Sequence, residues 1–136
     1  MTLDPVVIDS CVFTQDRGFI YWLKTYHGRK IISSVTYAEL QVYFLGTKKK
    51  EPSFFDGILR ASRIEVEWFK KDHALITGMY GAESDSFAED FRDFMIGSHA
   101  SIAPWIVVTY NVSDFHFLNG RAKSPDDFRK EHDNSF

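Results

Sequence analysis

The sequence has one cysteine and no long apolar run. Cys11 cannot form a disulfide within the chain, so a reducing compartment is the simpler expectation. No stretch approaches the roughly 18 uninterrupted apolar residues of a transmembrane helix. Met1 to Asp4 also lack the basic-then-apolar order of a signal peptide. We therefore expect a cytoplasmic protein with no membrane segment.

Several kinds of functional site also lack support. The chain has neither a Gly-x-x-x-x-Gly-Lys nor a Gly-x-Gly-x-x-Gly motif, so no glycine-rich loop predicts nucleotide binding. Five histidines are present, but none forms a pair at the spacing of zinc ligands, which disfavours zinc. They are His27, His73, His99, His116 and His132. The net charge of −3 means that a polyanion would have to be held by local basic residues or by metal ions.

The chain has the size and composition of one folded unit. Its 136 residues predict a single domain over 1–136. With 44% hydrophobic and 16% aromatic residues, it can bury a core without a disulfide or metal. From residue 123 onward, we expect a short capped turn of helix at Ser124–Phe128 and then a frayed polar tail.

Strand-like and helix-like segments alternate along the chain. Val6–Ile8 and Ile106–Val108 are short apolar runs typical of strands buried on both faces, and 31–33 and 64–68 predict further strands. Helical patterns cover 15–27, 36–45, 53–61, 72–80 and 86–102. Parallel strands need crossover connections, which helices supply, so the alternation predicts an α/β fold with a parallel sheet.

Four acids belong to segments that reach the carboxyl edge of this sheet, where ligands bind in open α/β folds. Asp9 ends the first strand, and Asp114 follows the strand 106–108. Glu39 is expected in the first turn of the helix after 31–33, and Asp93 in the long helix before 106–108. Carboxylates held close together repel unless a cation compensates, and hard oxygen ligands favour Mg²⁺ or Mn²⁺ over zinc. Such a centre suits phosphodiester hydrolysis.

Each acid also has a purely structural interpretation. Asp9 could cap the turn that follows it. Thr36 and Glu39 have the spacing of a capping box. Asp93 could be an exposed helical acid, and Asp114 could close an Asx-turn.

Five motifs, taken in order, resemble the PIN domain, in particular the VapC-type toxins. Val7-Ile8-Asp9-Ser10 is similar to its opening strand, and Thr36 to Leu40 to its "T-x-x-E-L" helix start. Asp93 to Ala100 has an acid, an isoleucine three residues later and small residues four and seven later. Val108 to Phe115 resembles "V-T-x-D/N-x-x-D-F", and Pro125 to Phe128 resembles a closing "P-x-x-F". The resemblance spans nearly the whole chain.

The resemblance implies a three-layer α/β/α fold and a metal-dependent endoribonuclease, the toxin of a toxin–antitoxin pair. It implies that Asp9, Glu39, Asp93 and Asp114 hold Mg²⁺ or Mn²⁺, with Ser10 and Thr109 in supporting hydrogen bonds. Asn111 stands where many relatives have aspartate. An amide brings no negative charge, so a second ion should bind more weakly.

Three further expectations concern partners. Lys48, Lys49 and Lys50 form the only dense basic run, and these lysines and Arg92 are candidates for RNA contact. The aromatic residues of the first two helices suit a core, a homodimer face or a groove, and in toxins of this family an antitoxin segment occupies such a groove. The rival function is a catalytically silent PIN fold that acts as a binding or scaffold module.

Overall fold

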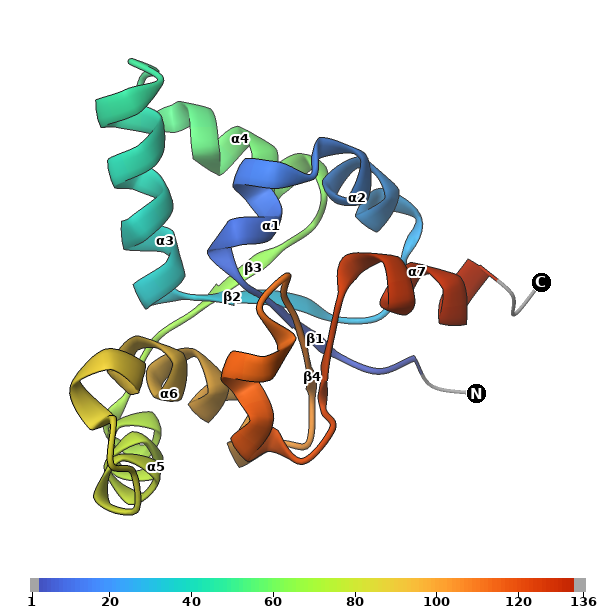
Figure 1. The fold of residues 1–136 in the computed structure, drawn as a ribbon. Coiled ribbons are helices and arrows are strands. Elements are labelled where there is room, and N and C mark those ends of the chain that lie inside the picture. Colours follow the sequence, from blue (N-terminus) through green and yellow to red (C-terminus); the bar gives the residue numbers. More distant parts are fainter. Residues whose placement is uncertain (1–2, 134–136) are drawn as a thin grey trace.

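A computed structural model describes residues 3–133 and contains one five-stranded sheet (Figure 1). The strands are β1 (Val6–Ile8), β2 (Lys30–Ser33), β3 (Glu65–Glu67), β4 (Ile106–Val108) and β5 (Ala122–Lys123). Their order is β3-β2-β1-β4-β5, and every neighbouring pair is parallel. The predicted α/β class with a parallel sheet is therefore confirmed. The two-residue β5 was not predicted from the sequence.

Helices cover both faces of the sheet (Figure 1). One face carries α1 (Ser10–Gln15), α2 (Arg17–Trp22), η1 (Leu23–Thr25), α3 (Ser34–Gln41), its π-helical continuation η2 (Val42–Thr47), α4 (Ser53–Ala61) and α7 (Pro125–Asp133). The other carries α5 (Lys71–Ala82), α6 (Phe87–Ile102) and the 3-10 segment η3 (Val112–Leu118). This is the expected three-layer arrangement. No helix within residues 3–133 is long and apolar enough to cross a bilayer.

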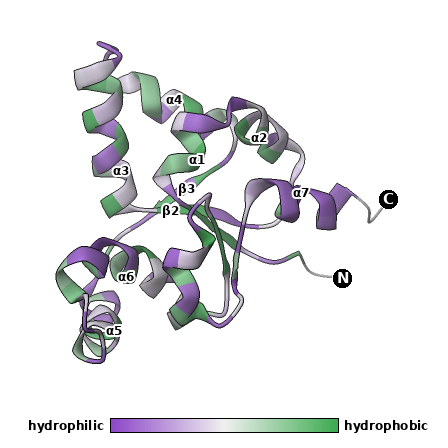
Figure 2. Ribbon diagram, in the orientation of Figure 1, coloured by the Kyte–Doolittle hydropathy of each residue, from purple (hydrophilic) through white to green (hydrophobic). Residues whose placement is uncertain are grey.

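The central strands are buried on both faces of the sheet. Successive apolar side chains of each strand point to opposite faces, and helices cover both. In β1, Val6 and Ile8 pack into the core beneath α1–α4 and α7, whereas Val7 packs into the core beneath α6 and η3. Hydropathy follows the same plan, with hydrophobic strands at the centre and hydrophilic residues along the outer helices (Figure 2). The apolar run therefore fixes β1 in the middle of the sheet.

The helix predicted over 15–27 is wrong in its bounds. Helix α1 begins at Ser10, and the chain breaks at Asp16 (φ −140°, ψ 80°) before α2 begins. The Asp16 carboxylate accepts a hydrogen bond from the Phe19 N–H at 2.9 Å, so this acid starts a new helix within a continuous apolar pattern.

The helix predicted over 36–45 also begins earlier than expected. Ser33 is its N-cap and accepts a hydrogen bond from the Val35 N–H at 3.1 Å. Thr36 therefore lies inside α3 and forms no capping box with Glu39, which lies in the second turn rather than the first.

The C-terminal segment is more ordered than a short turn with a polar tail. Helix α7 runs from Pro125 to Asp133, and Phe128 is fully buried against Phe19, Trp22 and Tyr26. The predicted frayed end at 134–136 lies outside the described residues. Ring packing therefore extends the helix beyond what the polar sequence indicated.

Candidate functional site

Asp9 is a buried carboxylate at the carboxyl end of β1. Its backbone N–H donates to the Val108 carbonyl at 3.0 Å, which places it beside the end of β4. Its Oδ1 accepts from the Ser10 N–H at 2.8 Å, and its Oδ2 accepts from the Thr109 hydroxyl at 2.8 Å. Only 1% of Asp9 is exposed. Asp9 thus caps α1, as one interpretation predicted, and still presents its carboxylate to Arg92 at the end of the strand.

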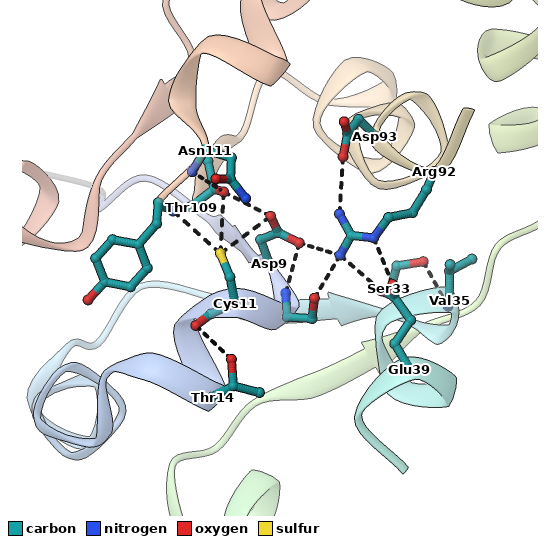
Figure 3. Close-up of polar contacts among 12 residues, drawn as sticks. Asp9, Cys11, Thr14, Ser33, Val35, Glu39, Arg92, Asp93, Thr109 and Asn111 are labelled. Carbon is teal, nitrogen blue, oxygen red and sulfur yellow. Dashed lines mark hydrogen bonds and ion pairs between the residues drawn. The ribbon is translucent and has the colours of Figure 1, made fainter. Parts of the chain in front are cut away.

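Glu39 and Asp93 approach the same place from α3 and α6 (Figure 3). Both acids and Asp9 contact one guanidinium, that of Arg92. Asp93 is half-buried and Glu39 is more open. Three of the four predicted acids therefore come together, although their segments are widely separated in the sequence.

Arg92 donates five hydrogen bonds into this cluster (Figure 3). The Nη2 group lies 2.5 Å from Asp9 Oδ1, 2.9 Å from Glu39 Oε1 and 2.8 Å from Ser10 Oγ. The Nε–H reaches Glu39 Oε2 at 2.8 Å, and Nη1 reaches Asp93 Oδ1 at 3.1 Å. Burial disfavours the guanidinium charge, but the hydrogen bonds of Glu39 and the charge of Asp9 raise the pKa of Arg92 above its ordinary value.

Asp114, the fourth acid, lies in the exposed first turn of η3. It acts on Asp93 through charge. Burial raises the pKa of Asp93, Arg92 opposes that rise, and the carboxylates of Asp9 and Asp114 add to it. Within residues 3–133 the Asp114 side chain has no hydrogen bond, so the predicted Asx-turn does not form. Asp114 therefore adds negative charge near Asp93 but makes no contact with Arg92.

Two of the three supporting residues, Ser10 and Thr109, donate hydrogen bonds to Asp9. The Thr109 hydroxyl is fully buried, donates to Asp9 and accepts from the Asn111 N–H at 3.0 Å. Ser10 accepts from Arg92. Asn111 is exposed at the start of η3. These contacts position Asp9, and any part in catalysis stays a prediction.

Lys48 and Lys50, from the lysine run, lie away from this acidic cluster. They instead line a cavity of about 520 Å³ between α1–α2, η2 and α4, with Arg17 and Lys24 on the same lining. Apolar and aromatic side chains form most of the rest of its wall, among them Phe13, Ile20, Tyr43, Phe44 and Phe54. Lys48 is nine residues beyond Glu39 along helical backbone, roughly 13 Å at 1.5 Å per residue. This cavity is therefore separate from the acids.

Cys11 is a neighbour of the site that sequence reasoning did not identify. Its Sγ lies 3.6 Å from both Asp9 Oδ2 and Thr109 Oγ1. Burial and the Asp9 charge raise the pKa of the Cys11 thiol, which keeps it protonated and unsuited to act as a nucleophile. Its position two residues after Asp9, in the first turn of α1, was the available signal.

A second cluster brings two histidines together, although no spacing in the sequence indicated it. Glu67, His73 and His99 offer ligand atoms within 4.8 Å of one another, a spacing that could hold a metal ion. However, His73 Nδ1 accepts from the Lys70 N–H at 3.0 Å, so its proton is on Nε2 and points at Glu67 Oε1, 3.2 Å away. His99 Nδ1 lies 2.7 Å from the same oxygen. If His73 bound a metal through Nε2, its proton would have to be on Nδ1. Two N–H groups, those of His73 Nδ1 and the Lys70 backbone, would then face each other. The hydrogen bonds therefore favour a structural role for Glu67, His73 and His99, which join β3, α5 and α6, over a metal site.

The small residues of α6 allow close packing on two sides. At Gly97, a Cβ would lie 2.5 Å from the Phe117 ring. Gly97 thus makes room for η3, while Ala100 packs with Val7 and Ile31.

Comparisons with solved structures place this fold among known ones. A chain of a toxin–antitoxin complex from Klebsiella pneumoniae is 17% identical with a TM-score of 0.66, covering 88% of this chain and 97% of that one. VapBC-1 from nontypeable Haemophilus influenzae is 17% identical with a TM-score of 0.59, covering 90% and 98%. DNA-bound VapBC from Salmonella typhimurium is 27% identical with a TM-score of 0.63, covering 90% and 99%. No family model and no curated protein matches the sequence. The chain has the PIN-like α/β fold of VapC structures.

Proposed function

We propose that this chain is a Mg²⁺- or Mn²⁺-dependent endoribonuclease and the toxin of a toxin–antitoxin pair. The convergence of Asp9, Glu39 and Asp93 from three separate segments carries the proposal. The similarity in fold to chains of toxin–antitoxin complexes supports it.

The donor set fits a hard divalent ion. Each of the Asp9, Glu39 and Asp93 carboxylates has an oxygen within 3.1 Å of one cationic group, so these side chains already share a cation. We propose that they hold the ion with help from Asp114. When bound, the ion would lower the pKa of the attacking water and offset the charge of the phosphate. Thr109 and Ser10 would orient the Asp9 carboxylate, and Asn111 would leave a second ion weakly held.

The cavity suits an antitoxin segment. Its lining is apolar and aromatic, and its charged members are the four cations Arg17, Lys24, Lys48 and Lys50. A segment with apolar side chains and acidic flanks would match both properties. We propose this occupant for the cavity, RNA for the acidic cluster and a homodimer as the working form.

The test is cleavage of single-stranded RNA by the purified full chain with Mg²⁺ or Mn²⁺. We expect products with a 5′-phosphate and no cleavage with chelator. Asp9→Asn and Asp93→Asn should each lower the rate by about 100-fold or more, as expected when a group that stabilises transition-state charge is lost. Asp90→Asn is the matched control because Asp90, on the same helix, pairs with Ser86 instead.

Two features favour the silent module as the alternative: Asn111 lacks a charge, and Arg92 already neutralises part of the acidic cluster. If calorimetry detects no metal binding and RNA stays intact, the silent module is correct. Cleavage that survives Asp9→Asn and Asp93→Asn would come from a contaminant or from another site.

A further inference from the structure

Arg92 contacts the three carboxylates that are proposed above to hold the metal ion. Its guanidinium contacts Asp9, Glu39 and Asp93 at 2.5 to 3.1 Å and uses all three of its nitrogens (Figure 3). The oxygens in these contacts belong to the carboxylates assigned above to the metal ion. Arg92 and the ion therefore draw on the same three carboxylates.

Both cations cannot use these oxygens fully at once. A divalent ion of this kind needs carboxylate oxygens at about 2.0–2.6 Å. A guanidinium hydrogen-bonded to the same oxygens would then lie a few ångströms from a doubly charged ion, and like charges at that separation repel strongly in a partly buried site. Asp9, which is 1% exposed, has no alternative position in solvent. The competition must be resolved by movement of Arg92.

Arg92 is able to move. Its side chain is 31% exposed, in contrast to 2% for that of Asp9. It projects from the second turn of α6, beside the exposed Phe91. An arginine side chain can turn to solvent without changing the helix that carries it.

We propose that Arg92 is an internal competitor of the divalent ion: the guanidinium holds the carboxylates together in the metal-free chain and must leave them when the ion binds. This inference rests on the proposed metal-dependent function. A fixed structural clamp would behave in the opposite way, because its removal would scatter the carboxylates and weaken metal binding. The sign of the change in metal affinity therefore separates the two roles.

The experiment is calorimetric titration of the full chain with MnCl₂, compared with Arg92→Gln, Arg92→Lys and Arg60→Gln. Arg92→Gln should bind Mn²⁺ about 5- to 150-fold more tightly, the usual range for coupled binding events. Arg92→Lys keeps the charge but loses the planar fork, so its affinity should be intermediate. Arg60, exposed on α4, is the control for loss of one positive charge and should leave the affinity unchanged.

Thermal unfolding supplies a second readout. Without metal, Arg92→Gln should melt at a lower temperature than the unsubstituted chain, because three carboxylates lose their cation. Saturating Mn²⁺ should raise its melting temperature by more than that of the unsubstituted chain. If Arg92→Gln does not fold, the tighter binding expected of Arg92→Lys still tests the proposal.

The outcomes separate the inference from the proposed function. Equal or weaker Mn²⁺ binding by both Arg92 variants, with binding by the unsubstituted chain intact, would overturn the competitor role alone. Absence of Mn²⁺ binding in every variant, together with intact RNA, would overturn both.

Discussion

His99 is a buried imidazole that predicts how stability depends on pH. Burial lowers the pKa of His99, the hydrogen bond and charge of Glu67 oppose this, and His73 adds to it. A histidine whose pKa is lower in the folded chain favours folding fully above about pH 6.5, and this contribution is lost as the pH falls through the folded pKa. Because its Nε2 has no partner among the described residues, a second proton there would be costly. We expect the free energy of unfolding to fall by up to about 1.4 kcal/mol per pH unit below pH 6.5.

Urea unfolding from pH 7.5 to pH 5 checks this expectation. In His99→Asn, the amide can still donate to Glu67 but does not titrate, so the loss of stability at low pH should be smaller. His27→Asn is the control, since His27 is exposed and should leave the pH dependence unchanged. An identical pH dependence in the unsubstituted chain and in His99→Asn would show that another group is responsible.

The candidate site was only partly predictable from single residues. Asp9 and Asp114 could be placed because they follow apolar strands, and strand ends are readable from sequence. Glu39 and Asp93 were placed less directly, through the helices that follow 31–33 and precede 106–108, and the family pattern supported both. Nothing local showed that Arg92 would turn toward Asp9 rather than toward solvent, because an arginine side chain reaches several positions from one helix face. His73 and His99 lie on different helices and meet only through tertiary packing, so the spacing of histidines in the sequence could not reveal their contact.

Helix α7 should stabilise the fold more than its polar sequence indicates. Phe128 is fully buried in a set of rings from α2 and the following loop, and the Trp22 Nε1–H donates to Asp133 at 2.8 Å. Phe128→Ala should lower the free energy of unfolding by about 3–5 kcal/mol, the usual cost of removing a buried ring. Urea denaturation would measure the change. Lys130→Ala, at an exposed position on the same helix, should change it by less than about 0.5 kcal/mol, and an equal loss in both variants would contradict the anchoring role.

Element boundaries were the least predictable part of the fold. Periodicity identified α6 nearly to the residue, since Ser86 and the following apolar positions are clear signals. The break at Asp16 was missed because apolar residues continue on both sides of it. Strand β5 has only Ala122 and Lys123, too few residues for any alternation to appear. Strand β5 is instead fixed by its pairing with β4, for example by the hydrogen bond from the Thr109 N–H to the Lys123 carbonyl at 3.0 Å.

The outer face of α5 indicates where two copies of the chain would meet. Leu75 is 67% exposed and Met79, one turn later, is 61% exposed. A Cβ at Gly78 would meet no atom within 4 Å, so this position on the helix faces open space. An exposed apolar helix face favours association with a partner surface, and a second copy offers the same face.

We therefore expect a homodimer with twice the 15.8 kDa mass of one chain, as measured by light scattering. Leu75→Glu combined with Met79→Glu should give a monomer, because paired carboxylates on the two facing helices would have to be desolvated next to one another. Val42→Glu is the control, as Val42 is 72% exposed on η2, on the other layer of the sheet. A monomer mass for the unsubstituted chain would refute the dimer. Dissociation by Val42→Glu but not by the α5 variant would assign the interface to the α3–η2 layer, next to the basic cavity.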